Sequence, residues 1–445
     1  MRILLINSPV RLNARPNCIP YGLATIASVL RNAGHDVVLY DANAVRPSIE
    51  DVAVFLDGDH WDIIGLSGLI TTYAWQKRLA RLVREKQPKA FLISGGGLAT
   101  SVPELLMDKI GFDALCIGEG EITMHELAAV LEGDGDIASV DGLALCKDGQ
   151  TIFNAPRENI ADLDSVPFPA WDMLPMEIYL ANPIWGSDAA NSSGFISGVN
   201  ISRSMNIISS RGCPHNCKFC YHLFGRGQYR FRSAANIVDE VELLVRDYGV
   251  DFIGFVDDNF MASKELVEAF CAERERRGLS VLWGCHGRVD SAQPAMLARM
   301  RQAGCVWIGY GVESGSPKIL KAMGKKATPQ QAEKAIIATR EAGIFANTTF
   351  IYGYPGETPE TVCETLRFKQ KLGIQVTSFY ATPYPGTPLF EEFAKAHIGD
   401  LEKMILALGN ATDFVINLTE FSDNDFHHYK TINDGLLSSE CPRQM

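Results

Sequence analysis

Continuous apolar runs rich in β-branched residues alternate with longer amphipathic stretches along the first third of the chain. Runs of the first kind predict buried strands, and apolar positions at helical spacing predict helices. The predicted strands are Ile3–Ile6, Asp36–Tyr40, Ile63–Leu66, Ala90–Ile93 and Ala114–Ile117, and the predicted helices are Tyr21–Arg31, Ile49–Leu56, Tyr73–Lys86, Pro103–Lys109 and Ile122–Leu131. Because this βα alternation is typical of a parallel sheet covered on both faces, we predict an open α/β domain over residues 1–133.

The periodicity fades between residues 134 and 204, where proline, glycine, serine and asparagine become frequent. We interpret this segment as a connector that contains one hairpin. The hairpin strands, Leu143–Cys146 and Thr151–Phe153, flank a turn at Asp148 and Gly149.

A second series of βα units follows over residues 205–390. Its predicted strands are Asn206–Ser210, Phe252–Asp257, Leu282–His286, Val306–Gly311, Asn347–Tyr352 and Val376–Ala381, and its helices are Ala235–Tyr248, Ser263–Arg277, Pro294–Ala303, Pro329–Ala342 and Pro359–Leu372. Since a closed barrel needs eight strands, we predict a partial (β/α)6 barrel that is open on one side. Residues 391–445 are expected to form a short, mainly helical tail with a disordered end.

The chain of 445 residues carries a formal net charge of −12 and has a pI near 5.3. This excess of negative charge gives no electrostatic footprint for nucleic acid, and we expect none as a partner. No apolar run is long enough to span a membrane, and residues 1–9 resemble a strand rather than a signal peptide, so we expect a cytoplasmic protein. Eleven cysteines in such a protein indicate buried apolar residues or metal ligands rather than a disulfide framework.

Three of the cysteines are clustered at the end of the first strand of the second series. They are Cys213, Cys217 and Cys220, with the spacing CxxxCxxC. Thiolates are suited to iron–sulfur clusters, and three of them leave one iron of a [4Fe-4S] cluster open to another donor. The alternative is a zinc site with His215 or His222 as the fourth ligand, but zinc sites commonly show paired CxxC spacing.

The cysteine triplet followed by six βα units resembles the radical S-adenosylmethionine (SAM) superfamily. The resemblance implies that SAM binds the open iron and is cleaved by one electron to methionine and a 5′-deoxyadenosyl radical. It also implies SAM contacts from residues that follow the cysteines and the ends of the later strands: Phe219, Asp257, Asp258, Arg288, Glu313 and Tyr354. For Arg288 and Tyr354, a purely structural role in a strand-to-helix turn is equally compatible with the sequence.

Three glycine-rich loops follow strands three to five of the N-terminal domain, at the edge where open parallel sheets bind ligands. They contain Ser67-Gly68-Leu69, Gly96-Gly97 and Gly118-Glu119. The arrangement is similar to cobalamin-binding domains of flavodoxin-like (Rossmann-type) fold, and it implies that these residues contact cobalamin. The DxHxxG motif of that family is absent near residues 17–25, so no histidine from this motif would ligate the cobalt. A domain retained only as a scaffold is the alternative.

The two resemblances together are those of cobalamin-dependent radical SAM enzymes (class B-type methyltransferases and cyclases). They imply methylation of an unactivated carbon of a small molecule, with SAM, a [4Fe-4S] cluster and cobalamin as cofactors and an electron donor such as flavodoxin or ferredoxin. We expect the reaction to be anaerobic, because a cluster with an open iron is sensitive to oxygen. Substrate contacts are expected from residues 182–200 and 413–428, and no catalytic acid or base can be named.

Three other functions remain open from the sequence. Oxidative cyclisation or rearrangement, as in anaerobic tetrapyrrole cyclases, uses the same architecture. A tRNA methylthiotransferase would need further cluster cysteines and a basic RNA module, and the acidic chain with scattered Cys18, Cys116 and Cys146 argues against one. A non-catalytic cobalamin sensor would leave the cysteine triplet without a role.

Overall fold

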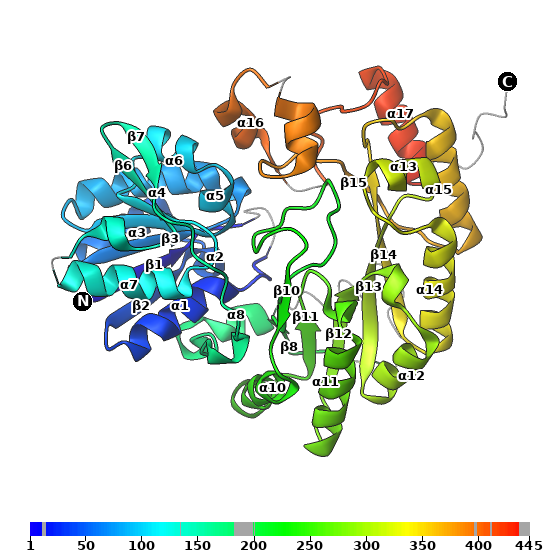
Figure 1. Ribbon diagram of the computed structural model, residues 1–445, viewed down its shortest axis with the longest axis horizontal. Helices are drawn as coiled ribbons and strands as arrows, with labels where there is room; N and C mark the ends of the chain where they lie inside the picture. The colour runs from blue at the N-terminus through cyan, green and yellow to red at the C-terminus, as the bar shows by residue number, and fades with distance from the viewer. Residues whose placement is uncertain are drawn as a thin grey trace. The chain divides into compact units, whose positions relative to one another are not determined.

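The computed structural model describes residues 1–10, 15–133, 135–181, 199, 201–395, 398–409 and 412–435. The chain forms two compact units (Figure 1). Unit 1 consists of Met1–Asn182 and Asp400–Leu408, and unit 2 consists of Pro183–Gly399 and Gly409–Met445. The expected open α/β domain and partial barrel with a helical tail are confirmed, whereas the finer division at residues 133, 204 and 390 remains a prediction.

Unit 1 is built on one seven-stranded sheet with the order β2-β1-β3-β4-β5-β6-β7. The strands are β1 (Arg2–Asn7), β2 (Asp36–Asp41), β3 (Ile63–Ser67), β4 (Phe91–Gly95), β5 (Ala114–Cys116), β6 (Leu143–Lys147) and β7 (Gln150–Phe153). The first five are parallel, and the hairpin β6–β7 extends the sheet in antiparallel fashion. The hairpin inside the expected connector therefore belongs to this sheet.

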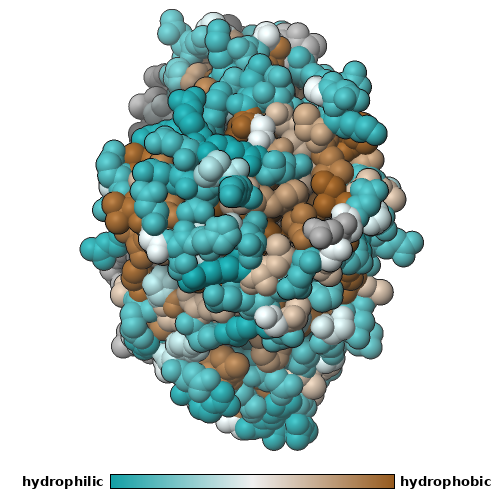
Figure 2. Space-filling model, turned by 90° about the vertical axis from the view of Figure 1, so that its left-hand side faces the viewer, coloured by the Kyte–Doolittle hydropathy of each residue, from teal (hydrophilic) through white to brown (hydrophobic). Residues whose placement is uncertain are grey.

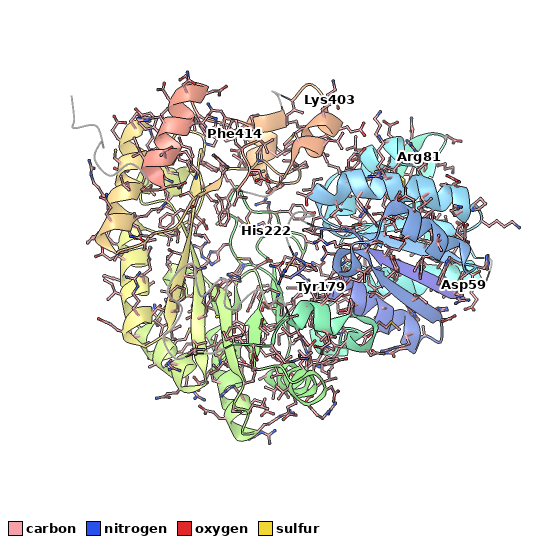
Figure 3. The ribbon with its side chains drawn as sticks, turned by 180° about the vertical axis from the view of Figure 1, so that it is seen from behind. Asp59, Arg81, Tyr179, His222, Lys403 and Phe414 are labelled. Atoms are coloured by element: carbon pink, nitrogen blue, oxygen red, sulfur yellow. The ribbon has the colours of Figure 1, made fainter. Side chains whose placement is uncertain are left out.

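Helices cover the sheet of unit 1, with α1 packed beside α7 and α3 beside α4 (Figure 1). Their bounds are α1 (Tyr21–Asn32), α2 (Ala42–Val45), α3 (Ile49–Asp57), α4 (Tyr73–Lys86), α5 (Gly96–Ser101), α6 (Pro103–Lys109), α7 (Glu121–Glu132), α8 (Met176–Leu180) and α16 (Leu401–Ala407). A side-chain contact attaches α8, because Tyr179 Oη donates a hydrogen bond of 2.7 Å to the buried Asp41 at the end of β2 (Figure 3). Ile3, Leu4 and Ile6 are fully buried (0% exposed), as expected for a central strand.

Unit 2 contains a curved six-stranded sheet with the order β15-β14-β13-β12-β11-β8. Its strands are β8 (Ser204–Ile207), β11 (Phe252–Phe255), β12 (Leu282–Gly287), β13 (Cys305–Glu313), β14 (Phe345–Tyr352) and β15 (Phe379–Tyr380), all parallel to their neighbours. The last strand is shorter than the sequence predicts, because only two of its residues pair with β14.

The outer face of this sheet is covered by a row of helices (Figure 1). They are α10 (Ala234–Tyr248), α11 (Lys264–Arg276), α12 (Pro294–Gln302), α13 (Pro317–Ala322), α14 (Pro329–Glu341), α15 (Pro359–Lys371) and, in the tail, α17 (Asp423–Asn433). Thr328 and Thr358 cap the starts of α14 and α15, and a proline occupies the first turn of each. A two-stranded ribbon, β9 (Ser210–Gly212) with β10 (Tyr229–Phe231), was not predicted.

The face of the molecule drawn in Figure 2 is mainly hydrophilic, with scattered apolar patches. No helix in the described part of the chain is long and apolar enough to cross a membrane.

Candidate active site

The three clustered cysteines lie in the loop between the ribbon strands β9 and β10. Gly212 starts this loop with a φ of +84°, and a Cβ atom there would lie 2.4 Å from the Gln228 carbonyl oxygen, so only glycine fits. Two backbone hydrogen bonds fix the middle of the loop: Lys218 N donates to Met323 O at 2.9 Å, and Leu389 N donates to Lys218 O at 2.9 Å. The loop is therefore held by two later segments of unit 2.

The three thiols are partly or fully buried, and one positively charged side chain lies beside them. Burial, followed by the charge of Asp258, raises the pKa of Cys220 to about 12. Burial also raises the pKa of Cys213. The Arg288 guanidinium donates to Cys217 Sγ at 3.6 Å. Metal ligation needs thiolates. The positive charge of Arg288 lies beside one sulfur, and the positive charge of bound iron would stabilise the thiolate form of all three cysteines.

The zinc alternative requires several ligands around one point. No three His, Cys, Asp or Glu side chains converge in this way within the described ranges. In a [4Fe-4S] cluster each thiolate ligates a different iron, so such convergence is not needed. His222 follows Cys220 closely, and both of its ring nitrogens are buried without a hydrogen-bond partner among the described residues (Figure 3).

Asp257, two residues after the end of β11, has one carboxylate oxygen without a partner among the described residues. Its Oδ1 accepts hydrogen bonds from Ser209 N (3.0 Å), from Ser209 Oγ (2.9 Å) and from Ser210 Oγ. Its Oδ2 is buried and has no partner in the described part of the structure. A buried, unpaired carboxylate oxygen is costly, and it fits an incoming ammonium group such as that of SAM. Asp258, the next residue, is exposed.

Glu313, at the end of β13, has a left-handed backbone with a φ of +68° and a buried side chain. Such backbone strain in a non-glycine residue is typical of functional sites. Its carboxylate forms an ion pair of 2.9 Å with the buried Lys325, which leaves the other oxygen for the hydroxyl groups of a ribose.

Arg288 and Tyr354 have different surroundings: Arg288 makes polar contacts, whereas Tyr354 packs among apolar side chains. Arg288 makes an ion pair of 2.9 Å with Asp290, donates to Lys325 O at 2.6 Å and reaches Cys217, so it links several parts of the site. The Tyr354 side chain is buried in an apolar cluster of unit 2, against which Phe219 packs. These two aromatic side chains are therefore packing residues, and any contact with SAM would come from their backbone.

The segment 322–326 after α13 was not predicted, yet it connects the elements of this site. Its carbonyl groups accept from Lys218 N and Arg288, and its Lys325 side chain pairs with Glu313. The run Met323-Gly324-Lys325-Lys326 carries no recognised spacing, so the only signal available in the sequence was a pair of lysines after a short helix.

In unit 1, the loops after β3 and β4 are joined by close backbone contacts. Leu98 N donates to Gly68 O at 3.1 Å. A Cβ on Gly96 (φ +82°) would lie 3.1 Å from Ser67 Oγ, and a Cβ on Gly68 would lie 2.2 Å from Thr72 Oγ1. A side chain at Gly96 would press on the loop after β3, and one at Gly68 would clash with Thr72 of its own segment, so both positions require glycine.

The rest of the predicted cobalamin site is open to a ligand, with one exception. Leu69 is 54% exposed, and a Cβ added at Gly118 (φ +79°) would meet no atom within 4 Å. Gly97 lies in the first turn of α5. Glu119, by contrast, is buried and accepts a 2.6 Å hydrogen bond from Ile160 N, so that oxygen has a structural role. An apolar exposed side chain beside glycine backbone fits a large flat ligand such as a corrin ring.

Comparison with known proteins agrees with both predicted cofactor-binding domains. Residues 207–368 match the model of the radical SAM superfamily, and residues 7–128 match that of the B12 binding domain. An uncharacterized methyltransferase, PH0819 of Pyrococcus horikoshii, is 32% identical over 398 residues, which are 88% of this chain and 83% of that protein. The anaerobic magnesium-protoporphyrin IX monomethyl ester cyclase of Rubrivivax gelatinosus is 28% identical over 397 residues, which are 87% of this chain and 68% of that protein.

Solved structures show the same fold at lower identity. The radical SAM methyltransferase TsrM from Kitasatospora setae, with cobalamin and a [4Fe-4S] cluster bound, is similar with a TM-score of 0.71 and 20% identity over 89% of this chain and 75% of that chain. The cobalamin-dependent radical enzyme OxsB gives a TM-score of 0.70 at 20% identity, over 94% of this chain and 58% of that chain. With both family models, a relative above 30% identity and the arrangement of the site, the chain belongs to the cobalamin-binding radical SAM enzymes.

Proposed function

We propose that this enzyme transfers a methyl group to an unactivated carbon of a small-molecule substrate. The observation that carries the proposal is the presence, in one chain, of a cysteine loop that fits a [4Fe-4S] cluster and of glycine loops that fit a corrin ring. When bound, the cluster supplies the electron that cleaves SAM, and cobalamin supplies the methyl group. Relatives named as methyltransferases, PH0819 among them, support this reading.

The residues of unit 2 would bind and orient SAM. Asp257 Oδ2 would accept from the amino group, because it is the carboxylate oxygen left unpaired. Arg288 lies beside Cys217 and would face the carboxylate group of SAM, while Glu313 would accept from the ribose hydroxyls. The electron would come from a flavodoxin or a ferredoxin, and we propose no nucleic acid as a partner.

Oxidative cyclisation is the second candidate, because cyclases of tetrapyrrole esters are 28% identical to this chain. The two functions differ in the fate of SAM. A methyl transfer through cobalamin converts one SAM to S-adenosylhomocysteine for each methyl group, whereas a cyclisation converts SAM only to 5′-deoxyadenosine and methionine.

The test is an anaerobic assay of the enzyme reconstituted with iron, sulfide and hydroxocobalamin. With SAM and a strong reductant, both S-adenosylhomocysteine and 5′-deoxyadenosine are expected by liquid chromatography, together with a change in the corrin spectrum. Formation of 5′-deoxyadenosine alone would favour the cyclase. Loss of the corrin on desalting would exclude methyl transfer through cobalamin.

A further inference from the structure

Basic residues are concentrated in two segments of unit 2, in a chain whose formal net charge is −12. Residues 211–232, which contain the cysteine loop, include five basic residues and no acidic one. Residues 314–332, around α13, include four basic residues and no acidic one. Two of these basic side chains form buried ion pairs, Arg232 with Glu240 and Lys325 with Glu313. The remaining charges make this part of an acidic protein locally positive.

The two segments meet at Asn216, an exposed residue between the first two clustered cysteines. A Cβ on Gly227 would lie 3.6 Å from Asn216 Nδ2, and a Cβ on Gly324 would lie 3.6 Å from Asn216 O. Nearby, Lys218 N donates a hydrogen bond of 2.9 Å to Met323 O. The basic residues on either side of this junction therefore belong to one region of the surface.

Four basic side chains lie around the junction, and we call them the basic surface: Lys218, Arg226, Lys321 and Lys326. The last three are exposed, and the Lys218 side chain is 40% exposed. The Arg226 guanidinium donates to the carbonyl oxygens of Cys217 (3.4 Å) and Cys220 (3.1 Å). Because carbonyl oxygens carry no net charge, these bonds hold the arginine at the cysteine loop without cancelling its positive charge.

The basic surface differs from the outer helices of unit 2 in its ion pairs. On those helices arginines are paired with carboxylates: Arg277 with Asp239 and Glu242, and Arg299 with Glu268 and Glu275. Lys218 pairs with Glu392 at 2.8 Å, but no carboxylate among the described residues pairs with the other three members. An exposed pair such as Lys218 with Glu392 is weak, so it cancels little of the attraction for an acidic partner.

The position and the sign of this charge indicate the kind of partner. The cysteines belong to the same loop, so a protein docked on the basic surface would come close to an iron–sulfur cluster bound there, as electron transfer requires. An acidic protein is attracted to a positive region and repelled by the acidic remainder of the chain, which fixes where it docks. A long polyanion such as RNA would extend beyond the four basic residues onto that acidic remainder.

We propose that the basic surface is the docking site of an acidic one-electron carrier protein, of which flavodoxin is the test case. In the step that follows docking, the reduced carrier loses one electron and the iron–sulfur cluster gains it, and no bond is formed or broken. The inference deepens the proposed function and rests on it, because it assumes that the three cysteines hold the cluster. It adds the surface and the side chains that receive the carrier.

The first test measures the binding of a fluorescently labelled bacterial flavodoxin to the reconstituted enzyme by anisotropy, without SAM or substrate. Raising the salt from about 0.01 M to about 0.15 M shortens the Debye length from about 30 Å to about 8 Å, so wild-type binding should weaken. Lys321→Gln with Lys326→Gln should bind about 2- to 30-fold more weakly, the effect of two lost exposed charge pairs, and should respond less to salt. Lys321→Arg with Lys326→Arg keeps both charges and should bind like the wild type.

The matched control is Arg301→Gln with Arg367→Gln, which removes two exposed charges from α12 and α15. Arg301 ends α12 shortly before β13 begins, at the edge of the sheet opposite the strand ends where the cysteine loop lies. This variant should bind flavodoxin like the wild type. Equal binding to the control and to the double glutamine variant would overturn the proposal. Tighter binding of a single-stranded RNA oligonucleotide than of flavodoxin would also overturn it.

The second test follows reduction of the iron–sulfur cluster by anaerobic stopped-flow absorption, in enzyme reconstituted with iron and sulfide alone. Reduced flavodoxin below saturation should react about 2- to 30-fold more slowly with the double glutamine variant than with the control. Reduced methyl viologen, a small cation that needs no docking surface, should reduce both at the same rate. A double glutamine variant that is slow with both reductants would show that the lysines act on the cluster itself, which would contradict docking.

These readouts need neither SAM cleavage nor methyl transfer. If flavodoxin bound as expected but S-adenosylhomocysteine were never formed, methyl transfer would be refuted and the docking surface would stand. If methyl transfer proceeded with methyl viologen while flavodoxin did not bind, the docking surface would be refuted and the proposed function would stand.

Discussion

Replacing Asp257 with asparagine should stabilise the protein while it weakens SAM binding. Burial raises the pKa of Asp257 from 3.8 to about 6. A carboxyl whose pKa is higher in the folded state favours folding below its unfolded pKa, and that contribution is lost as the pH rises through the folded pKa. At pH 7.5 the ionised group therefore costs about 3 kcal/mol, which falls to about 1.5 kcal/mol at pH 5.

Asparagine removes this charge and keeps an oxygen for the hydrogen bonds from Ser209 and Ser210. Because a neutral acceptor is weaker, we expect a net gain of about 1–3 kcal/mol at pH 7.5, or about 2–10 °C in Tm. SAM binding should weaken about tenfold or more, since the charge-assisted hydrogen bond to the ammonium group is lost.

Differential scanning fluorimetry of the reconstituted Asp257→Asn variant at pH 5.0 and pH 7.5 measures the stability, and titration with SAM measures the affinity. Asp251→Asn is the matched control. Asp251 lies directly before β11 and, like Asp257, accepts hydrogen bonds from a serine, namely from Ser202 N (2.9 Å) and Ser202 Oγ (2.6 Å). That variant should not gain stability. A lower Tm for Asp257→Asn at both pH values, or a gain that does not shrink toward pH 5.0, would refute the reasoning.

Three further predictions address the cluster, the ribose side of the site and the tail helix. Alanine at all three cysteines should remove the iron–sulfur shoulder at about 400 nm and abolish SAM cleavage, with the corrin bands retained. Lys325→Met should destabilise unit 2 by about 3–5 kcal/mol, because it leaves the Glu313 carboxylate buried and unpaired, and adding Glu313→Gln should restore Tm. Glu402→Gln should cost about 0.5–1 kcal/mol, because Glu402 accepts from Tyr73 Oη (2.6 Å) and Lys77 Nζ (2.5 Å) at a partly exposed site. Lys403→Ala, on the exposed side of the same helix (Figure 3), should leave Tm unchanged.

The strands and most helices could be predicted from the sequence, because a parallel strand that is buried on both faces is a continuous run of apolar residues. Ile63–Leu66, for example, is predicted within one residue of β3 (Ile63–Ser67). The cysteine loop could be predicted as well, since three thiols within eight residues form a local pattern that needs no tertiary information.

Features that depend on contacts between distant residues could not be predicted. The ribbon β9–β10 pairs three residues on each side, too few for a periodic signal. The α16 segment packs on unit 1 through the hydrogen bond from Tyr73 to Glu402, two residues that lie more than 300 positions apart along the chain. His286 was assigned to a strand, but its edge-on contact with Trp307 depends on the register of β12 and β13 and on the absence of a side chain at Gly309.

The charged side chains around the predicted SAM site differ in how far they are already paired. Glu313 pairs with Lys325 at 2.9 Å and Arg288 pairs with Asp290 at 2.9 Å, whereas Asp257 keeps one buried carboxylate oxygen without a partner among the described residues. Because a buried charge without a partner is costly, we expect the ammonium group of SAM to bind at Asp257 rather than at the two ion pairs.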